Sequence, residues 1–203
     1  MPKLILFEGT DGSGKSTLIE KFRDYLTSRN LSSQIISKEK VALAGSITRI
    51  YKYSDVPNEV EIFLRIAREF SKADAIDKTK DFALVDRAIL SLATTITNFG
   101  HKWELYRNII DLIKAKYGEF TTVFCYSPFN IARQRITVRA EQEGYVLSKK
   151  EAKGLEYNLR IFNILQQLSD NKYLTGMSNI KVDTDQFDEE QALSILIEHI
   201  LDS

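Results

Sequence analysis

Residues 3–17 read KLILFEGTDGSGKST, and this stretch decides the fold. An apolar run, Leu4 to Phe7, precedes a glycine-rich segment, Gly9-Thr10-Asp11-Gly12-Ser13-Gly14-Lys15-Ser16-Thr17. The spacing of Gly, four residues, Gly, Lys and then Ser matches the phosphate-binding loop pattern, which requires a strand before it and a helix after it. Lys3 to Phe7 is predicted to be that strand. Thr17 to Arg29 carries apolar side chains at helical spacing and is predicted to be that helix.

The segment from Gly9 to Thr17, called the phosphate loop below, predicts binding of ATP together with Mg²⁺. Its glycines allow the backbone to curl so that successive N–H groups point at phosphate oxygens. The helix that follows adds the positive end of its dipole at the same place. Lys15 can bridge the β- and γ-phosphates, and the hydroxyl of Ser16 can bind the metal ion.

The composition indicates one α/β domain and argues against several classes of partner. The chain has 203 residues, of which 43% are hydrophobic, and this is enough for a full core. Basic and acidic residues balance at 28 each, so no basic excess supports a nucleic-acid partner. Cys125 lies in an apolar run and is predicted to be a buried strand thiol. The sequence shows no apolar segment of signal-peptide or membrane-spanning length, which predicts a cytoplasmic protein without a membrane partner.

The rest of the chain alternates between strand-like and helix-like segments. Further strands are predicted at residues 33–37, 82–86, 120–126 and 180–183, and helices at about 47–53, 57–70, 90–99, 103–117, 128–139, 148–168 and 189–201. The helix that Pro57 opens is predicted to turn one apolar face inward: Val60, Phe63, Leu64, Ala67 and Phe70. The predicted fold class is α/β, a three-layer P-loop fold with a five-stranded parallel sheet and helices on both faces. It forms one domain, residues 1–203, with a small basic lid at about residues 136–155.

Asp86 and Arg87 follow the third predicted strand. Ligands on such sheets bind beyond the carboxyl ends of the strands, and this would place the pair beside the phosphate loop. There the carboxylate of Asp86 can hold Mg²⁺ through its water shell, and the planar fork of Arg87 suits a phosphate. The alternative is an aspartate that caps a helix beside a surface arginine.

Basic side chains gather after the fourth predicted strand, beginning with Arg133, Arg135 and Arg139. Arg135 and Arg139 are four residues apart and would share a helix face. A break around Gly144 follows them, and after it come three lysines: Lys149, Lys150 and Lys153. A basic segment that closes over a triphosphate would offset the charge that develops in the transition state and would exclude water. The alternative is a solvated charged face that neighbouring glutamates partly balance.

Two motifs resemble the thymidylate kinase family: FEGTDGSGKST at residues 7–17, and Asp86-Arg87 with Ser91 five residues after Asp86. The resemblance extends along most of the chain. It implies that ATP phosphorylates dTMP to dTDP on a homodimeric enzyme. It also implies that Asp11 lies near magnesium and the sugar 3′-hydroxyl, and that Arg68 forms a hydrogen bond with thymine.

The same resemblance assigns two further roles to arginines. Arg49 would face the acceptor phosphate. Gly12 stands where one subgroup of the family has a basic residue, so the chain resembles the subgroup that keeps its catalytic arginine in the lid. Arg135 or Arg139 would then be that arginine.

The acceptor side of the sequence departs from the family pattern. Leu64 stands where an aromatic residue usually stacks on thymine, and Ala88 replaces the aromatic residue that usually follows Asp-Arg. Thr94-Thr95-Ile96 occupies the place of Ala-Tyr-Gln, which contacts the base and the sugar. Lys38-Glu39-Lys40 lacks the Pro-Gly-Gly that follows the family's Arg-Glu. These changes leave the triphosphate site intact and leave the base and sugar of the acceptor open.

A deoxynucleoside kinase is the main alternative, because that family shares this fold and this lid spacing. A nucleoside hydroxyl must lose a proton, and Glu39 at the end of the second predicted strand could accept it as a general base. A monophosphate is already anionic and needs cations instead, which Arg49, Arg68 and Arg87 supply. A GTP-binding switch protein is disfavoured, because the sequence lacks the tetrad that recognises guanine in that class.

Overall fold

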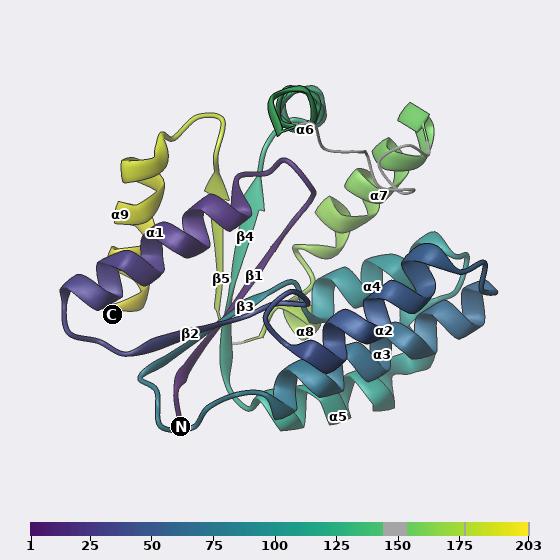
Figure 1. Cartoon of the computed structure of the whole chain (residues 1–203), viewed down its shortest axis with the longest axis horizontal. Helices are drawn as coiled ribbons and strands as arrows, with labels where there is room; N and C mark the ends of the chain where they lie inside the picture. The colour runs from purple at the N-terminus through teal and green to yellow at the C-terminus, as the bar shows by residue number, and fades with distance from the viewer. Residues whose placement is uncertain (144–153, 177, 203) are drawn as a thin grey trace.

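The computed structural model describes residues 1–143, 154–176 and 178–202. Its sheet has five parallel strands in the order β2-β3-β1-β4-β5 (Figure 1). The strands are β1 (Lys3–Gly9), β2 (Ser33–Ile36), β3 (Phe82–Asp86), β4 (Phe120–Tyr126) and β5 (Ser178–Asp183). The predicted α/β class and the predicted five-stranded parallel sheet are therefore confirmed.

Helices lie on both faces of this sheet (Figure 1). One face is covered by α1 (Lys15–Ser28) and α9 (Glu189–Ile200). The other face is covered by α3 (Asn58–Asp74), α4 (Ile89–Asn98), α5 (Arg107–Tyr117), α7 (Gly154–Leu168) and the short α8 (Lys172–Thr175). Three elements complete the order: α2 (Ala42–Tyr53), which packs against α3, the short turn η1 (Trp103–Tyr106) before α5, and α6 (Phe129–Glu143) after β4.

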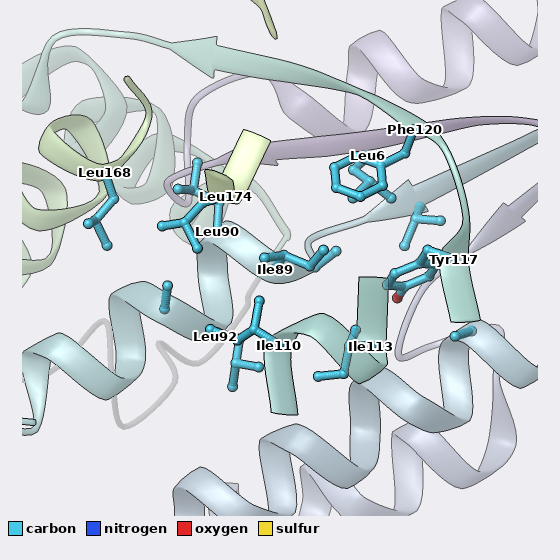
Figure 2. Packing of buried hydrophobic residues seen from close by; sticks show 14 of the residues in the cluster. Leu6, Ile89, Leu90, Leu92, Ile110, Ile113, Tyr117, Phe120, Leu168 and Leu174 are labelled. Atoms are coloured by element: carbon cyan, nitrogen blue, oxygen red, sulfur yellow. The ribbon is translucent and has the colours of Figure 1, made fainter. Parts of the chain in front are cut away.

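The central strands send alternate side chains into two cores, as the two-residue period of a strand requires. Leu4 and Leu6 of β1 join the core beneath α3, α4 and α5, whereas Ile5 and Phe7 join the core beneath α1 and α9. Figure 2 shows part of the first core, where Leu6 lies near apolar residues of α4 and α5. Cys125 is buried in the second core, as predicted, and burial raises the pKa of its thiol to about 12.

The inward face of α3 differs from the predicted one. Val60 and Phe63 are 44% and 58% exposed, and Ala67 is exposed as well. The buried residues of the helix are Ile62, Ile66, Arg68, Glu69, Ser71, Lys72 and Ala73. Phe70 packs against the core as predicted, but the rest of the predicted stripe was wrong, because the apolar inward residues are Ile62, Ile66 and Ala73. This helix also buries charged side chains that form ion pairs with one another.

Some helix bounds also differ from the sequence pattern. α2 begins at Ala42, earlier than the predicted start near Ile47, and α8 was not predicted. The start of the helix predicted over residues 148–168 lies outside the described residues, and that helix is described from Gly154 onward as α7. Within the described segments, no helix combines the length and the apolar content that crossing a bilayer requires.

Candidate functional site

The phosphate loop joins the carboxyl end of β1 to the start of α1, as the motif requires. Gly12 has a φ of 79°, and a Cβ on it would lie 2.1 Å from the carbonyl oxygen of Ala132 in α6. Only glycine can therefore occupy this position with α6 packed so closely. Gly14 precedes α1, and within the described residues no side chain caps the first turn of that helix. The backbone arrangement suits an anion at this place.

Lys15 and Asp86 form an ion pair beside the carboxyl ends of the adjacent strands β1 and β3. Lys15 is the first residue of α1 and is buried, while Asp86 closes β3 beside Phe7 of β1. Burial alone would raise the pKa of Asp86, but the positive charges of Lys15 and Arg87 outweigh burial and lower it. Asp86 is therefore ionised at neutral pH. The predicted proximity of the phosphate loop and Asp86 is observed.

Arg87 occupies a left-handed backbone conformation directly after β3, with a φ of 59°. Its N–H donates to the carbonyl oxygen of Phe7 at 2.8 Å, which continues the ladder between β3 and β1. Its Nη2 lies 2.5 Å from Oδ1 of Asp11 in the phosphate loop. The structure thus joins three predicted site residues at one point: Asp11, Asp86 and Arg87.

Glu8 is a buried carboxylate whose role the sequence reasoning missed. Its Oε1 accepts hydrogen bonds from the backbone N–H groups of Ala88 at 2.8 Å, Leu90 at 3.0 Å and Ser91 at 3.2 Å. Its Oε2 accepts from the hydroxyl of Ser91. Burial raises the pKa of Glu8, although these hydrogen bonds act in the opposite direction. A strand residue therefore caps α4. The sequence feature that could have revealed this role is the single acidic residue between the apolar run and Gly9.

A second buried polar group connects α2 and α3. Glu69 accepts two hydrogen bonds from Arg68, at 2.9 Å from Nε and 2.6 Å from Nη2, and it pairs with Nζ of Lys72 at 2.7 Å. Nη1 of Arg68 donates to the hydroxyl of Tyr51 at 2.6 Å. Burial would raise the pKa of Glu69, but Lys72 and Arg68 outweigh it and lower the pKa. The ion pairs of Glu69 with Arg68 and Lys72 could not be predicted, because pairing among buried charges has no sequence periodicity.

A cavity of about 590 Å³ opens from the phosphate loop and continues between α2, α3, α4, α6 and α7. Among the described residues, five carboxylates line it: Asp11, Glu39, Asp55, Glu61 and Asp86. Nine cationic side chains of the same described segments line it as well: Lys15, Lys38, Lys52, Arg65, Arg68, Lys72, Arg87, Arg133 and Arg139. Positive charge is therefore concentrated at this cavity, although the full sequence has a formal net charge of zero. Such a cavity favours an anionic ligand.

The structure brings most of the predicted side chains to this cavity. Those that line it are Thr10, Asp11, Lys15, Ser16, Glu39, Arg68, Asp86, Arg87, Thr94 and Arg139. Gly9, Gly12, Ser13, Gly14 and Thr17 belong to the loop without lining the cavity themselves. The hydroxyl of Thr94 donates to the carbonyl oxygen of Leu90 at 2.8 Å, inside its own helix.

Outside the phosphate loop, three predicted site residues do not line the cavity. Arg49 is exposed on α2, where its Nη2 donates to the hydroxyl of Ser46 at 3.0 Å. Leu64 lies on α3 away from the cavity. Arg135 donates to the carbonyl oxygen of Thr184 at 2.8 Å. The orientation of α6 is set by its packing, which sequence spacing cannot supply.

The predicted lid is only partly within the described residues. Arg133 and Arg139 of α6 line the cavity, while Lys149, Lys150 and Lys153 lie outside the described residues. Arg133 was noticed in the sequence but was given no role of its own. The described part of the lid therefore contributes one cation, Arg139, to the cavity wall, and Arg133, just before the lid, adds a second.

No model of a known protein family matches this chain, and no curated protein matches it either.

Proposed function

We propose that the protein is a kinase that transfers the γ-phosphoryl group of MgATP to a nucleoside monophosphate, with dTMP as the expected acceptor. One observation carries the proposal: the phosphate loop, Asp86 and the arginines of α3 and of the β3 end open into a single positively charged cavity. A triphosphate donor and a monophosphate acceptor are both anions that such a cavity attracts. The resemblance of the phosphate loop and of Asp86-Arg87 to thymidylate kinases supports the same reaction.

The donor is expected to bind at the phosphate loop. Its backbone N–H groups and Lys15 would hold the β- and γ-phosphates, and Lys15 would exchange Asp86 for a phosphate oxygen. Ser16 and Asp86 both border the cavity, and a hydroxyl and a carboxylate are oxygen ligands of the kind that Mg²⁺ prefers. When bound, the ion would neutralise charge between the β- and γ-phosphates.

The acceptor is expected to bind on the side of Arg87 and α3. A phosphate oxygen of the acceptor attacks the γ-phosphorus, a new P–O bond forms, and the bond to the β–γ bridging oxygen breaks to release ADP. Arg87 would orient the attacking phosphate, while Arg133 and Arg139 would offset charge on the transferred group. Arg65 and Arg68 of α3 also line the cavity, and they would contact the rest of the acceptor.

The proposal is tested by ADP release from MgATP with matched acceptors. The decisive pair is dTMP and thymidine, with the other deoxynucleoside monophosphates and deoxynucleosides measured beside them. Turnover with monophosphates alone supports the proposal. Turnover with a nucleoside instead would establish a kinase that phosphorylates a hydroxyl group. The absence of ADP release with every acceptor would reject both kinase reactions.

Glu39 distinguishes the two candidate reactions by mutation. Its side chain lines the cavity, yet it is 62% exposed and lies 3.5 Å from Nζ of Lys38. A monophosphate needs no general base, so we expect Glu39→Gln to change turnover by less than about threefold, whereas loss of a general base costs about a hundredfold or more. Steady-state rates with dTMP check this. A collapse of turnover would make Glu39 the base for a hydroxyl acceptor.

We also propose that the protein is a homodimer, as the family resemblance implies. Apolar side chains are exposed along α3 and the neighbouring η1–α5 segment: Val60, Phe63, Leu105 and Leu112. Since α3 packs against α5, these residues form a candidate interface, called the α3–α5 face here. We expect Phe63→Glu combined with Leu112→Glu to convert a dimer to a monomer in sedimentation, because buried charges would oppose association.

Leu43→Glu provides the matched control for the dimer. Leu43 is an exposed apolar residue of α2, outside the α3–α5 face, so its replacement should leave the dimer intact. A wild-type protein that sediments as a monomer at high concentration would overturn the dimer.

A further inference from the structure

We infer that Lys72 of α3 is a positioning residue that holds Arg87 in its left-handed conformation. Lys72 belongs to α3, and its side chain reaches the residues at the end of β3. It is 1% exposed. The turn it contacts, Asp86 to Ala88, is called the Arg87 turn below. The effect on catalysis rests on the proposed function, in which Arg87 orients the acceptor phosphate.

The Arg87 turn has a backbone conformation that its residues do not favour. Arg87 has a φ of 59°, which is uncommon for a residue with a side chain, and Ala88 follows with φ −153° and ψ −118°. Such conformations persist only when surrounding contacts hold them, and they gather at functional sites. The Arg87 turn therefore needs partners outside itself.

Lys72 supplies those partners for the carbonyl groups of the turn. Its Nζ donates to the carbonyl oxygens of Asp86, at 3.3 Å, and of Arg87. It also lies 2.7 Å from Oε2 of Glu69. An ammonium group has three donors, and here three acceptors use them. Lys72 borders the cavity, but it has no donor left for a ligand, so its contacts indicate positioning rather than binding.

The N–H groups around the same turn are held from the opposite side. The N–H of Arg87 donates to Phe7, and the N–H of Ala88 donates to the carboxylate of Glu8. Two buried ionisable side chains thus fix one turn: Glu8 accepts from it, and Lys72 donates to it. Without the ammonium group, two carbonyl oxygens lose a donor and Arg87 can relax toward ordinary backbone angles.

Hydrogen exchange of backbone amides tests the positioning without any assay of function. We expect Lys72→Met to speed exchange at Arg87 and Ala88 by about tenfold or more, while the amides of β4 keep their protection, because local opening is independent of global unfolding. Lys116→Met is the control, since Lys116 of α5 forms an exposed ion pair with Asp74 of α3, the helix that carries Lys72. Unchanged exchange at the turn would overturn the inference, and so would an equal increase throughout the sheet.

A double-mutant cycle on turnover tests the catalytic consequence. Lys72→Met should lower turnover with dTMP by about a hundredfold in the wild-type background, the cost of a misplacement of about 1 Å. In the Arg87→Ala background the same change should cost less than about threefold, because residues that act as one unit are non-additive. If Lys72→Met lowered turnover by the same factor in the wild-type and Arg87→Ala backgrounds, the inference would be overturned.

The two measurements separate failure of this inference from failure of the proposed function. If no acceptor is turned over, the exchange rates at the Arg87 turn still decide whether Lys72 holds it. If Lys72→Met does not fold, Glu69→Gln replaces it in both experiments. That variant keeps the shape of Glu69 but removes the charge that fixes Lys72, so the same local pattern is expected at a smaller size.

Discussion

Replacement of Lys15 by methionine is expected to lower turnover by about a hundredfold or more, the loss that removal of one preorganised charge contact causes. Methionine keeps the length and apolar character of the stem, so the change removes little besides the ammonium group. Lys15 is buried at the start of α1, where its ammonium group forms an ion pair with Asp86. The same ammonium would stabilise the charge between the β- and γ-phosphates during transfer. The affinity for MgADP should weaken as well, and calorimetry measures it.

Lys21→Met is the matched control for Lys15→Met. Lys21 lies on the same helix but pairs with Glu190 at the surface, 2.6 Å away, and does not line the cavity. Its loss should leave turnover unchanged, because an exposed ion pair contributes little to stability. If Lys15→Met retained turnover within about tenfold of the wild type, its ammonium would not stabilise the transition state.

Arg87→Ala is expected to lower turnover with dTMP by about a hundredfold or more. The guanidinium group of arginine can bind a phosphate through two parallel hydrogen bonds, and alanine has no group that could replace it. The KM for dTMP should rise while the KM for MgATP changes little, because the proposed function assigns Arg87 to the acceptor phosphate. Arg87→Lys should recover only part of the activity, since lysine is a point charge without the fork.

Arg49→Ala is the control for the acceptor arginine. Arg49 carries the same charge, but it is exposed on α2 and does not line the cavity. The family resemblance placed it at the acceptor phosphate, whereas its position in the structure implies turnover close to wild type. Near-normal activity of Arg87→Ala, or a large loss in Arg49→Ala, would remove the acceptor role from Arg87.

The parts of the fold that the sequence predicted follow from local chemistry. The β4 strand was predicted over residues 120–126 and spans Phe120–Tyr126, because apolar and β-branched residues there favour a buried strand. The phosphate loop could be recognised because its pattern requires glycine at positions 9 and 14, and both Gly9 and Gly14 have a positive φ. Asp86 meets Lys15 because the carboxyl ends of parallel strands share one edge of the sheet.

The parts that the sequence could not predict depend on tertiary packing. The buried face of α3 includes Arg68, Glu69 and Lys72, whose charges are tolerated only because they pair with one another in space. On α6, Arg139 lines the cavity and Arg135 turns to Thr184, a difference that helix packing decides. Glu8 was visible as an isolated acid, but its partners are 80 or more residues away along the chain.

The cap that Glu8 provides has a consequence for the order of folding. The first turn of α4 takes its acceptor from β1, 80 residues earlier than Ala88, so this helix start is a non-local contact. Non-local contacts form late, because loop-closure entropy must be overcome first. The start of α4 therefore becomes stable only after β3 has paired with β1, and the same pairing sets the phosphate loop beside Arg87. The phosphate loop and the Arg87 turn are thus expected to reach their final positions in one cooperative step.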